Sequence, residues 1–109
     1  MTNKKQPDFI FDLTGKHIAN WVDEQLYAPT GENIGHYLPD LEIFIDMKGN
    51  YLGEIIFDER LVYDINSPYK LQNFGSLGDF GNIGNLGNPG NFGSLSLASN
   101  YTEIKAYWL

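Results

Sequence analysis

The sequence predicts an all-β protein in which short β-hairpins repeat around a pseudo-fourfold axis, followed by a tripeptide tract and a C-terminal strand. Residues 9–59 contain three segments with the same spacing of glycine, apolar and small residues. Glycine, β-branched and aromatic residues dominate these segments, which disfavours helices and favours strands. Residues 75–93 then carry glycine at every third position, a pattern that needs its own explanation.

The hairpin repeat is defined by Gly15, Gly31 and Gly49, which lie 16 and 18 residues apart. Three residues after each of them comes an apolar residue, and the next position holds a small one. These small residues are Ala19, Gly35 and Gly53. A fourth copy begins with the sequence RLVYDINSPY but has serine and proline where the turn glycine is expected. The alternative is an ordinary meander sheet whose hairpins resemble one another by chance.

Each copy predicts two strands joined by a tight turn. The first strands are expected over 9–11, 26–28, 43–45 and 61–63, and the second strands over 18–22, 34–38 and 52–56. The connecting sequences DLTG, APTG and DMKG suit a type I turn closed by a glycine bulge, because the bulge residue has a positive φ. Since one hairpin of this length cannot bury its apolar face alone, the four hairpins are expected to share one core.

The segments TGKHIANW, TGENIGHY and KGNYLGEI, followed by LVYD, resemble the four-fold beta-flower domain family over residues 9–66. In that family each petal is a hairpin with a Gly-x-x-apolar-small signature. The resemblance implies a shallow, nearly symmetric β-barrel with petals around a central pore, and it implies no particular activity. Ala19, Gly35 and Gly53 would either line this pore or sit where strands crowd together. Similarity of shape to Tubby-like folds points to lipid binding only by analogy.

Composition divides the chain into an N-terminal tail (1–8), the hairpin repeats (9–72), a glycine-triplet tract (73–95) and a C-terminal strand (96–109). A polyproline II or polyglycine II helix has three residues per turn, so the tract would present three ridges. The first ridge is glycine: Gly75, Gly78, Gly81, Gly84, Gly87, Gly90 and Gly93. The second is apolar: Phe74, Leu77, Phe80, Ile83, Leu86, Pro89 and Phe92. The third is small and polar: Ser76, Asp79, Asn82, Asn85, Asn88, Asn91 and Ser94.

Three arrangements of the tract fit this pattern. Rods from several chains bundle, the tract wraps its own barrel or enters its pore, or it is disordered, since glycine-rich segments lose much entropy on ordering. A collagen triple helix is disfavoured because Pro89 is the tract's one proline. Self-association is the favoured arrangement, since it buries the apolar ridge. The final sequence YTEIKAYWL alternates as a strand that returns to the sheet and could replace part of the fourth hairpin.

Composition also narrows the class of protein. The 109 residues suffice for one small domain. Fourteen acidic residues against seven basic ones argue against nucleic acid as the main partner, because phosphate binding needs clustered cations. The chain has no cysteine, no secretory signal and no apolar run of membrane-helix length. These features favour a soluble cytoplasmic protein without a transmembrane segment, with leaderless export left open.

Signals for catalysis or cofactors are weak. His17 and His36 hold non-equivalent places in their hairpins and are expected to be partly exposed strand residues. No metal-binding or phosphate-binding motif is present. The acidic turns between hairpins are the best candidate ion site, and weak calcium candidates there are Asp23, Asp40 and Asp58. Solvated turns in an acidic protein are the simpler explanation.

The sequence therefore predicts a non-enzymatic structural module without a cofactor, whose tract mediates formation of a homo-oligomer. One alternative is a module that binds a lipid or another small apolar molecule in the central pore. Another is a small acidic, immunity-like protein that masks a basic partner, which only size and charge indicate.

Overall fold

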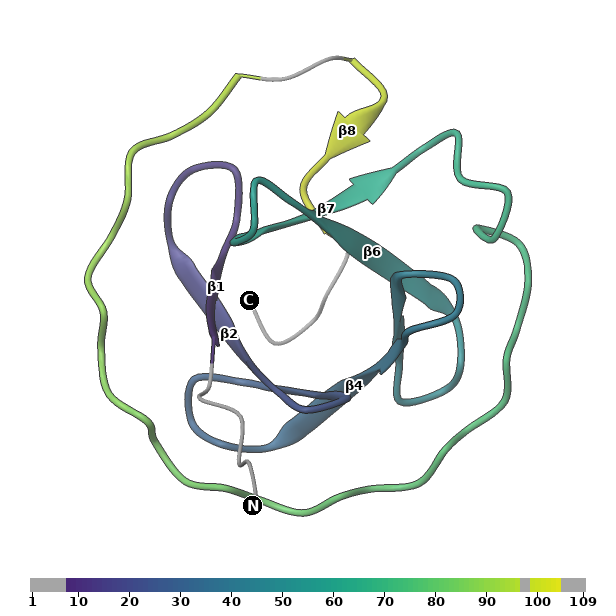
Figure 1. Ribbon diagram of the computed structural model, residues 1–109, viewed down its shortest axis with the longest axis horizontal. Coiled ribbons are helices and arrows are strands. Elements are labelled where there is room, and N and C mark those ends of the chain that lie inside the picture. Colours follow the sequence, from purple (N-terminus) through teal and green to yellow (C-terminus); the bar gives the residue numbers. More distant parts are fainter. Residues whose placement is uncertain (1–7, 97–98, 105–109) are drawn as a thin grey trace.

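The computed structural model describes residues 8–96 and 99–104, which contain eight strands and no helix. The strands are β1 (Asp8–Phe11), β2 (His17–Val22), β3 (Gln25–Tyr27), β4 (Asn33–Leu38), β5 (Ile43–Asp46), β6 (Tyr51–Ile56), β7 (Arg60–Asp64) and β8 (Tyr101–Thr102). Successive strands pair antiparallel, and β1 also pairs in parallel with β7 through Phe11 and Arg60. Seven strands thus form a closed barrel, and β8 is added to β7 (Figure 1). The all-β prediction is confirmed.

The first three hairpins, β1–β2, β3–β4 and β5–β6, each have a shift of pairing register at the equivalent position. In each, the pairing register shifts at the last pair before the turn: Ile10/Phe11, Leu26/Tyr27 and Phe44/Ile45. The turn glycines Gly15, Gly31 and Gly49 have φ values of 94°, 111° and 91°. Each donates its N–H to the carbonyl three residues earlier. The repeat in the sequence therefore corresponds to a repeat of bulged hairpins with left-handed glycines.

The fourth hairpin is made by segments far apart in the sequence. β7 pairs with β8 through Tyr63–Thr102 and Asp64–Tyr101, and residues 65–100 are inserted between the two strands. Ser67 occupies the place of the turn glycine and donates its N–H to the Asp64 carbonyl at 3.0 Å. The C-terminal strand thus completes the hairpin that the fourth repeat begins. Residues 105–109 of the predicted strand lie outside the described part.

One apolar cluster fills the interior of the barrel. Its buried members come from strands β1 to β7, from the turn after β3 and from the segment after β8: Ile10, Ile18, Ala19, Leu26, Ala28, Ile34, Phe44, Leu52, Leu61 and Ile104. Trp21 and Tyr37 pack on this cluster, and their ring centroids lie 4.7 Å apart and 5.0 and 4.9 Å from that of Phe44. This packing of aromatic and branched side chains accounts for the closure of so short a sheet.

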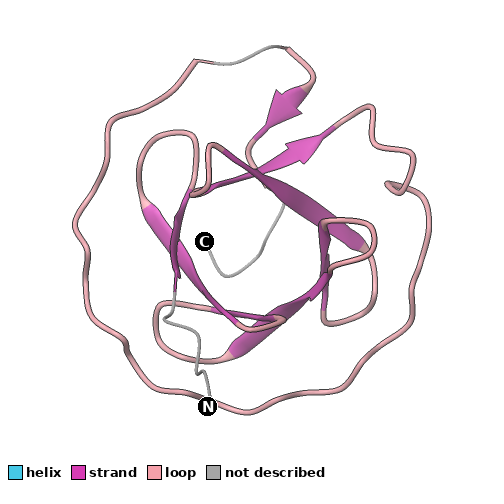
Figure 2. Cartoon of the chain, viewed as in Figure 1, coloured by secondary structure: helices cyan, strands magenta, loops and turns pink. Residues whose placement is uncertain are grey.

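Residues 73–95, called the belt from here on, run around the outside of the barrel without regular secondary structure (Figures 1 and 2). Of the three predicted arrangements of the tract, wrapping of its own barrel is the one observed in this single chain. Six belt glycines, from Gly75 to Gly90, have φ between 78° and 107°. Polyproline II has φ near −75° throughout. The belt therefore keeps the three-residue period with a different backbone conformation.

Candidate functional site: the belt and the barrel surface beneath it

Each triplet of the belt is a small turn closed by a side chain. The polar residue accepts the N–H of the glycine two positions later, with oxygen–nitrogen distances of 2.7 to 2.8 Å in five triplets. These turns start at Asn73, Asp79, Asn82, Asn85 and Asn88. A Cβ added to any belt glycine would meet nothing within 4 Å. Where φ is positive, glycine is therefore required for its conformation and not for lack of space.

The belt docks on the barrel at three points that lie nine residues apart. The N–H groups of Phe74, Ile83 and Phe92 donate to the carbonyls of Gly49, Gly31 and Gly15 at 2.8, 3.0 and 2.8 Å. Nine residues are three triplets, so the residue that donates to each turn glycine always belongs to the apolar ridge. The period of the belt thus matches the spacing of the hairpins around the barrel.

The turn glycines also let the belt backbone approach closely. A Cβ on Gly31 would lie 2.5 Å from the Gly84 nitrogen, a distance that real Cβ contacts do not show. On Gly49 or Gly15, a Cβ would overlap the carbonyl oxygen of Gly75 or of Phe92. At these three positions glycine is required both for a positive φ and for the space that the belt occupies.

Asn33 on β4 connects the second hairpin to the belt. Its Oδ1 accepts the N–H of Phe80 at 2.9 Å, and its backbone N–H donates to the Gly81 carbonyl at 3.2 Å. Its Nδ2 donates to the carbonyls of Leu26 and Gly35. Because the side chain is buried and fully used, its loss would leave belt and barrel groups unpaired.

His36, also on β4, is buried beneath the belt, with 1% of its surface exposed. This corrects the expectation of a partly exposed histidine, and the reason is that the belt covers this face. Its Nδ1 lies 2.6 Å from Oε1 of Gln25, and the Phe80 ring meets the imidazole edge-on at 5.7 Å. Nε2 has no hydrogen-bond partner among the described residues. Burial lowers the pKa of His36, and the carboxylate of Asp79 opposes this shift.

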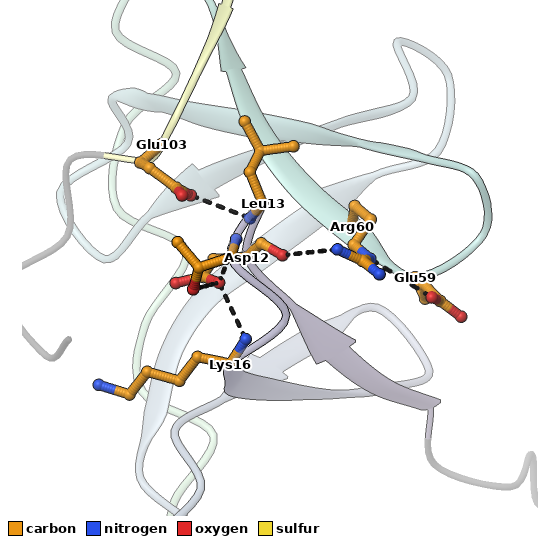
Figure 3. A network of polar contacts seen from close by, with 7 residues as sticks. Asp12, Leu13, Lys16, Glu59, Arg60 and Glu103 are labelled. Carbon is orange, nitrogen blue, oxygen red and sulfur yellow. Dashed lines mark hydrogen bonds and ion pairs between the residues drawn. The ribbon is translucent and has the colours of Figure 1, made fainter. Parts of the chain in front are cut away.

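Phe92 connects the belt to the first hairpin through its aromatic ring. Its ring stacks on Phe11 with centroids 4.1 Å apart and planes at 15°, and the Arg60 guanidinium carbon lies 5.9 Å from its centroid. Arg60 is buried and donates from Nη1 to the Asp12 carbonyl at 3.2 Å (Figure 3). Next to it, Glu103 accepts the Leu13 N–H at 3.1 Å, which ties the segment after β8 to the first turn.

The apolar ridge of the belt remains partly exposed after wrapping. The exposed fractions are 50% for Leu77, 57% for Phe80, 37% for Ile83 and 43% for Phe92. Phe74 and Leu86 are half-buried. One side of the belt thus covers the barrel, and large apolar side chains face solvent around its circumference.

The three small residues predicted near a pore lie where strands approach one another. Ala19 is fully buried in the interior cluster. A Cβ on Gly35 would lie 2.7 Å from the Ile45 carbonyl oxygen, and one on Gly53 would overlap that of Val62. Neither Gly35 nor Gly53 has a positive φ, so close approach alone accounts for glycine at both.

The described residues provide no cluster of possible metal ligands. Residues 8–96 and 99–104 contain no group of three or more His, Cys, Asp or Glu side chains that could hold a metal ion. Asp23, Asp40 and Asp58 sit on separate turns and form no such group. His17 Nε2 pairs with Asn20 Oδ1 at 2.8 Å. Burial raises the pKa of Tyr51, whose hydroxyl donates to Glu54.

Comparisons with protein-family models, with curated proteins and with solved structures give no match. Over the part of the chain that the structure describes, no helix has the length and hydropathy needed to cross a membrane.

Proposed function

We propose that this chain is a non-enzymatic assembly module and that copies associate through the belt. The observation that supports this proposal is the exposed part of the apolar ridge, above all Leu77 and Phe80. Apolar side chains that recur at a fixed spacing on one surface are typical of protein–protein contacts. Three hydrogen bonds to the turn glycines hold the belt backbone that carries these side chains. Because this backbone is already ordered, the entropy cost of association is lower.

The charge of the chain sets the condition under which association is expected. A net charge of −7 makes copies repel one another at low ionic strength. Salt screens this repulsion and strengthens the contact of apolar surfaces. The oligomer is therefore expected to be more stable at 0.5 M than at 0.05 M sodium chloride.

The solution mass tests this proposal. Light scattering after size exclusion should give a multiple of 12.3 kDa for the full chain. Leu77→Ser should shift the chain towards the monomer, because it removes an exposed apolar side chain of the belt. Leu71→Ser is the matched control, since Leu71 is 93% exposed but precedes the belt. A monomer at every concentration and salt, or equal effects of the two substitutions, would contradict the proposal.

We also propose that the chain is related to the four-fold beta-flower domain family. The three equivalent bulged hairpins, each with the Gly-x-x-apolar-small sequence, support this relationship. The fourth hairpin differs from the other three because the belt is inserted into its turn. An experimental structure in which the four hairpins do not superpose after successive rotations of about 90° would contradict it.

A further inference from the structure

A groove of about 300 Å³ lies between the belt and the first two hairpins. The barrel contributes Lys16, His17 and Pro29, and the belt contributes Asn85, Asn88 and Asn91. This volume is at the lower end of the range for small-molecule sites. The apolar ridge is not part of the lining, so the groove is a feature separate from the proposed assembly surface.

The belt presents hydrogen-bond donors to this groove. The Oδ1 atoms of Asn85 and Asn88 accept the N–H groups of Gly87 and Gly90 at 2.7 and 2.8 Å. This fixes each carboxamide, with its oxygen towards the backbone and its Nδ2 on the opposite side. Neither Nδ2 has a hydrogen-bond partner within residues 8–96 and 99–104. Two amide donors thus belong to side chains that line the groove.

Lys16 gives the groove its positive charge. Its backbone N–H donates to the Asp12 carboxylate at 3.0 Å, while its side chain extends away from that carboxylate (Figure 3). The Asp12 oxygen is already engaged by Thr14 as well. No carboxylate lines the groove, although the chain has 14 acidic residues. The groove is therefore rich in donors and locally positive on an acidic protein.

We propose that this groove binds a small oxyanion, a phosphate or carboxylate group, through the Lys16 ammonium and the Nδ2 groups of Asn85 and Asn88. Ammonium and amide donors form charge-assisted hydrogen bonds with such oxygens. The oxygens of Asn85 and Asn88 already accept glycine N–H groups, whereas their Nδ2 groups are free to donate, which favours an anionic ligand. The net negative charge of the protein opposes the entry of an anion, and the Lys16 ammonium offsets this repulsion at the groove.

The test is a titration of the full ¹⁵N-labelled chain with sodium phosphate and, separately, with sodium succinate, at constant ionic strength. The side-chain amide signals of Asn85 and Asn88 should shift and saturate. The signal of Asn73 should not, because its Nδ2 donates to the Lys48 carbonyl. Saturation by phosphate alone identifies a phosphate group as the ligand, and saturation by succinate identifies a carboxylate. No saturable shift with either anion, or an equal response to glucose, would overturn the proposal.

Matched substitutions make the test specific. Asn88→Asp replaces the free donor by a carboxylate oxygen and keeps the oxygen that accepts the Gly90 N–H, a role that Asp79 already has for Gly81. Ser76→Asp adds the same charge at the corresponding place of another triplet, outside the groove. Asn88→Asp and Lys16→Gln should each weaken anion binding about tenfold or more, and Ser76→Asp by less than about threefold. Equal effects of Asn88→Asp and Ser76→Asp would show that the groove is not the site.

Discussion

Gly31 allows the contribution of belt docking to be measured apart from backbone strain. Its φ is 111°, close to the 107° of Gly87 within the belt. A Cβ on Gly31 would meet the belt backbone, whereas a Cβ on Gly87 would meet nothing within 4 Å. Left-handed strain costs alanine about 1–2 kcal/mol at either place, and the reduced entropy of the unfolded chain offsets about 0.4–1 kcal/mol of it. The two substitutions therefore differ mainly in the belt contact.

The lost belt contact determines how much more Gly31→Ala lowers the free energy of unfolding than Gly87→Ala does. Alanine at position 31 must displace the belt and so break the bond from Ile83 N–H to the Gly31 carbonyl, and the bond from Phe80 to Asn33 lies close by. Each buried hydrogen bond contributes about 1 kcal/mol. We therefore expect Gly31→Ala to lower the free energy of unfolding by about 2–4 kcal/mol, and Gly87→Ala by about 1 kcal/mol.

Urea unfolding followed by tryptophan fluorescence measures both values, and Trp21, which packs against the interior cluster, reports on the transition. The amide of Ile83 should also lose protection from hydrogen exchange in Gly31→Ala and keep it in Gly87→Ala. If both substitutions cost the same and leave Ile83 protected, the belt does not dock at Gly31 and the reasoning fails.

Three further predictions concern the barrel and the surface beneath the belt. Gly53→Ala should lower the free energy of unfolding by about 1–3 kcal/mol in a urea titration, because its Cβ overlaps the Val62 carbonyl; a neutral effect would favour a pore at this position. Arg60→Met should cost about 1–3 kcal/mol in the same assay through the lost bond to Asp12, whereas Glu59→Gln, at a partly exposed partner, should cost less than about 0.5 kcal/mol; equal costs would contradict this account. The pKa of His36 in the folded chain lies below the ordinary 6.5, so on acidification the unfolded chain binds a proton at this residue before the folded chain does. The contribution of neutral His36 to the free energy of unfolding should therefore be fully present above pH 6.5, and it should be lost as the pH falls towards the pKa of the folded chain. His36→Leu should reduce this loss between pH 7 and 5 in thermal melts, and an unchanged profile would exclude His36 as its source.

The hairpins could be predicted from the sequence because local chemistry determines them. The turn glycines mark positions of positive φ, and the same chemistry recurs at three places with one bulge each. Strands β1 to β7 begin within one residue of the predicted positions, whereas β8 begins five residues after the start of the predicted C-terminal strand. Even the fourth turn keeps its Asp64–Ser67 hydrogen bond, although serine replaces glycine.

The path of the belt could not be predicted in this way. Every triplet offers the same glycine, apolar and polar residues, so no local signal shows that one triplet in three meets a turn. Which triplets meet a turn depends on the circumference of the barrel, and this is a property of the folded chain. Burial of His36 follows from the belt and was missed for the same reason. One signal was readable: an Asn or Asp two residues before a glycine favours a side-chain-capped turn, and this indicates the observed backbone more directly than a three-residue helix does.

Amide hydrogen exchange along the belt tests most directly whether it encircles the barrel in a nine-residue register. Protection is expected at Phe74, Ile83 and Phe92, whose N–H groups donate to the three turn glycines, and at Phe80 through Asn33. Fast exchange is expected at the glycines from Gly84 to Gly90, which donate only to exposed side chains. Protection that recurs at 74, 83 and 92 would support the account. Uniformly fast exchange from 74 to 92 would show that the belt is not docked, and uniformly slow exchange would show a different packing of the whole segment.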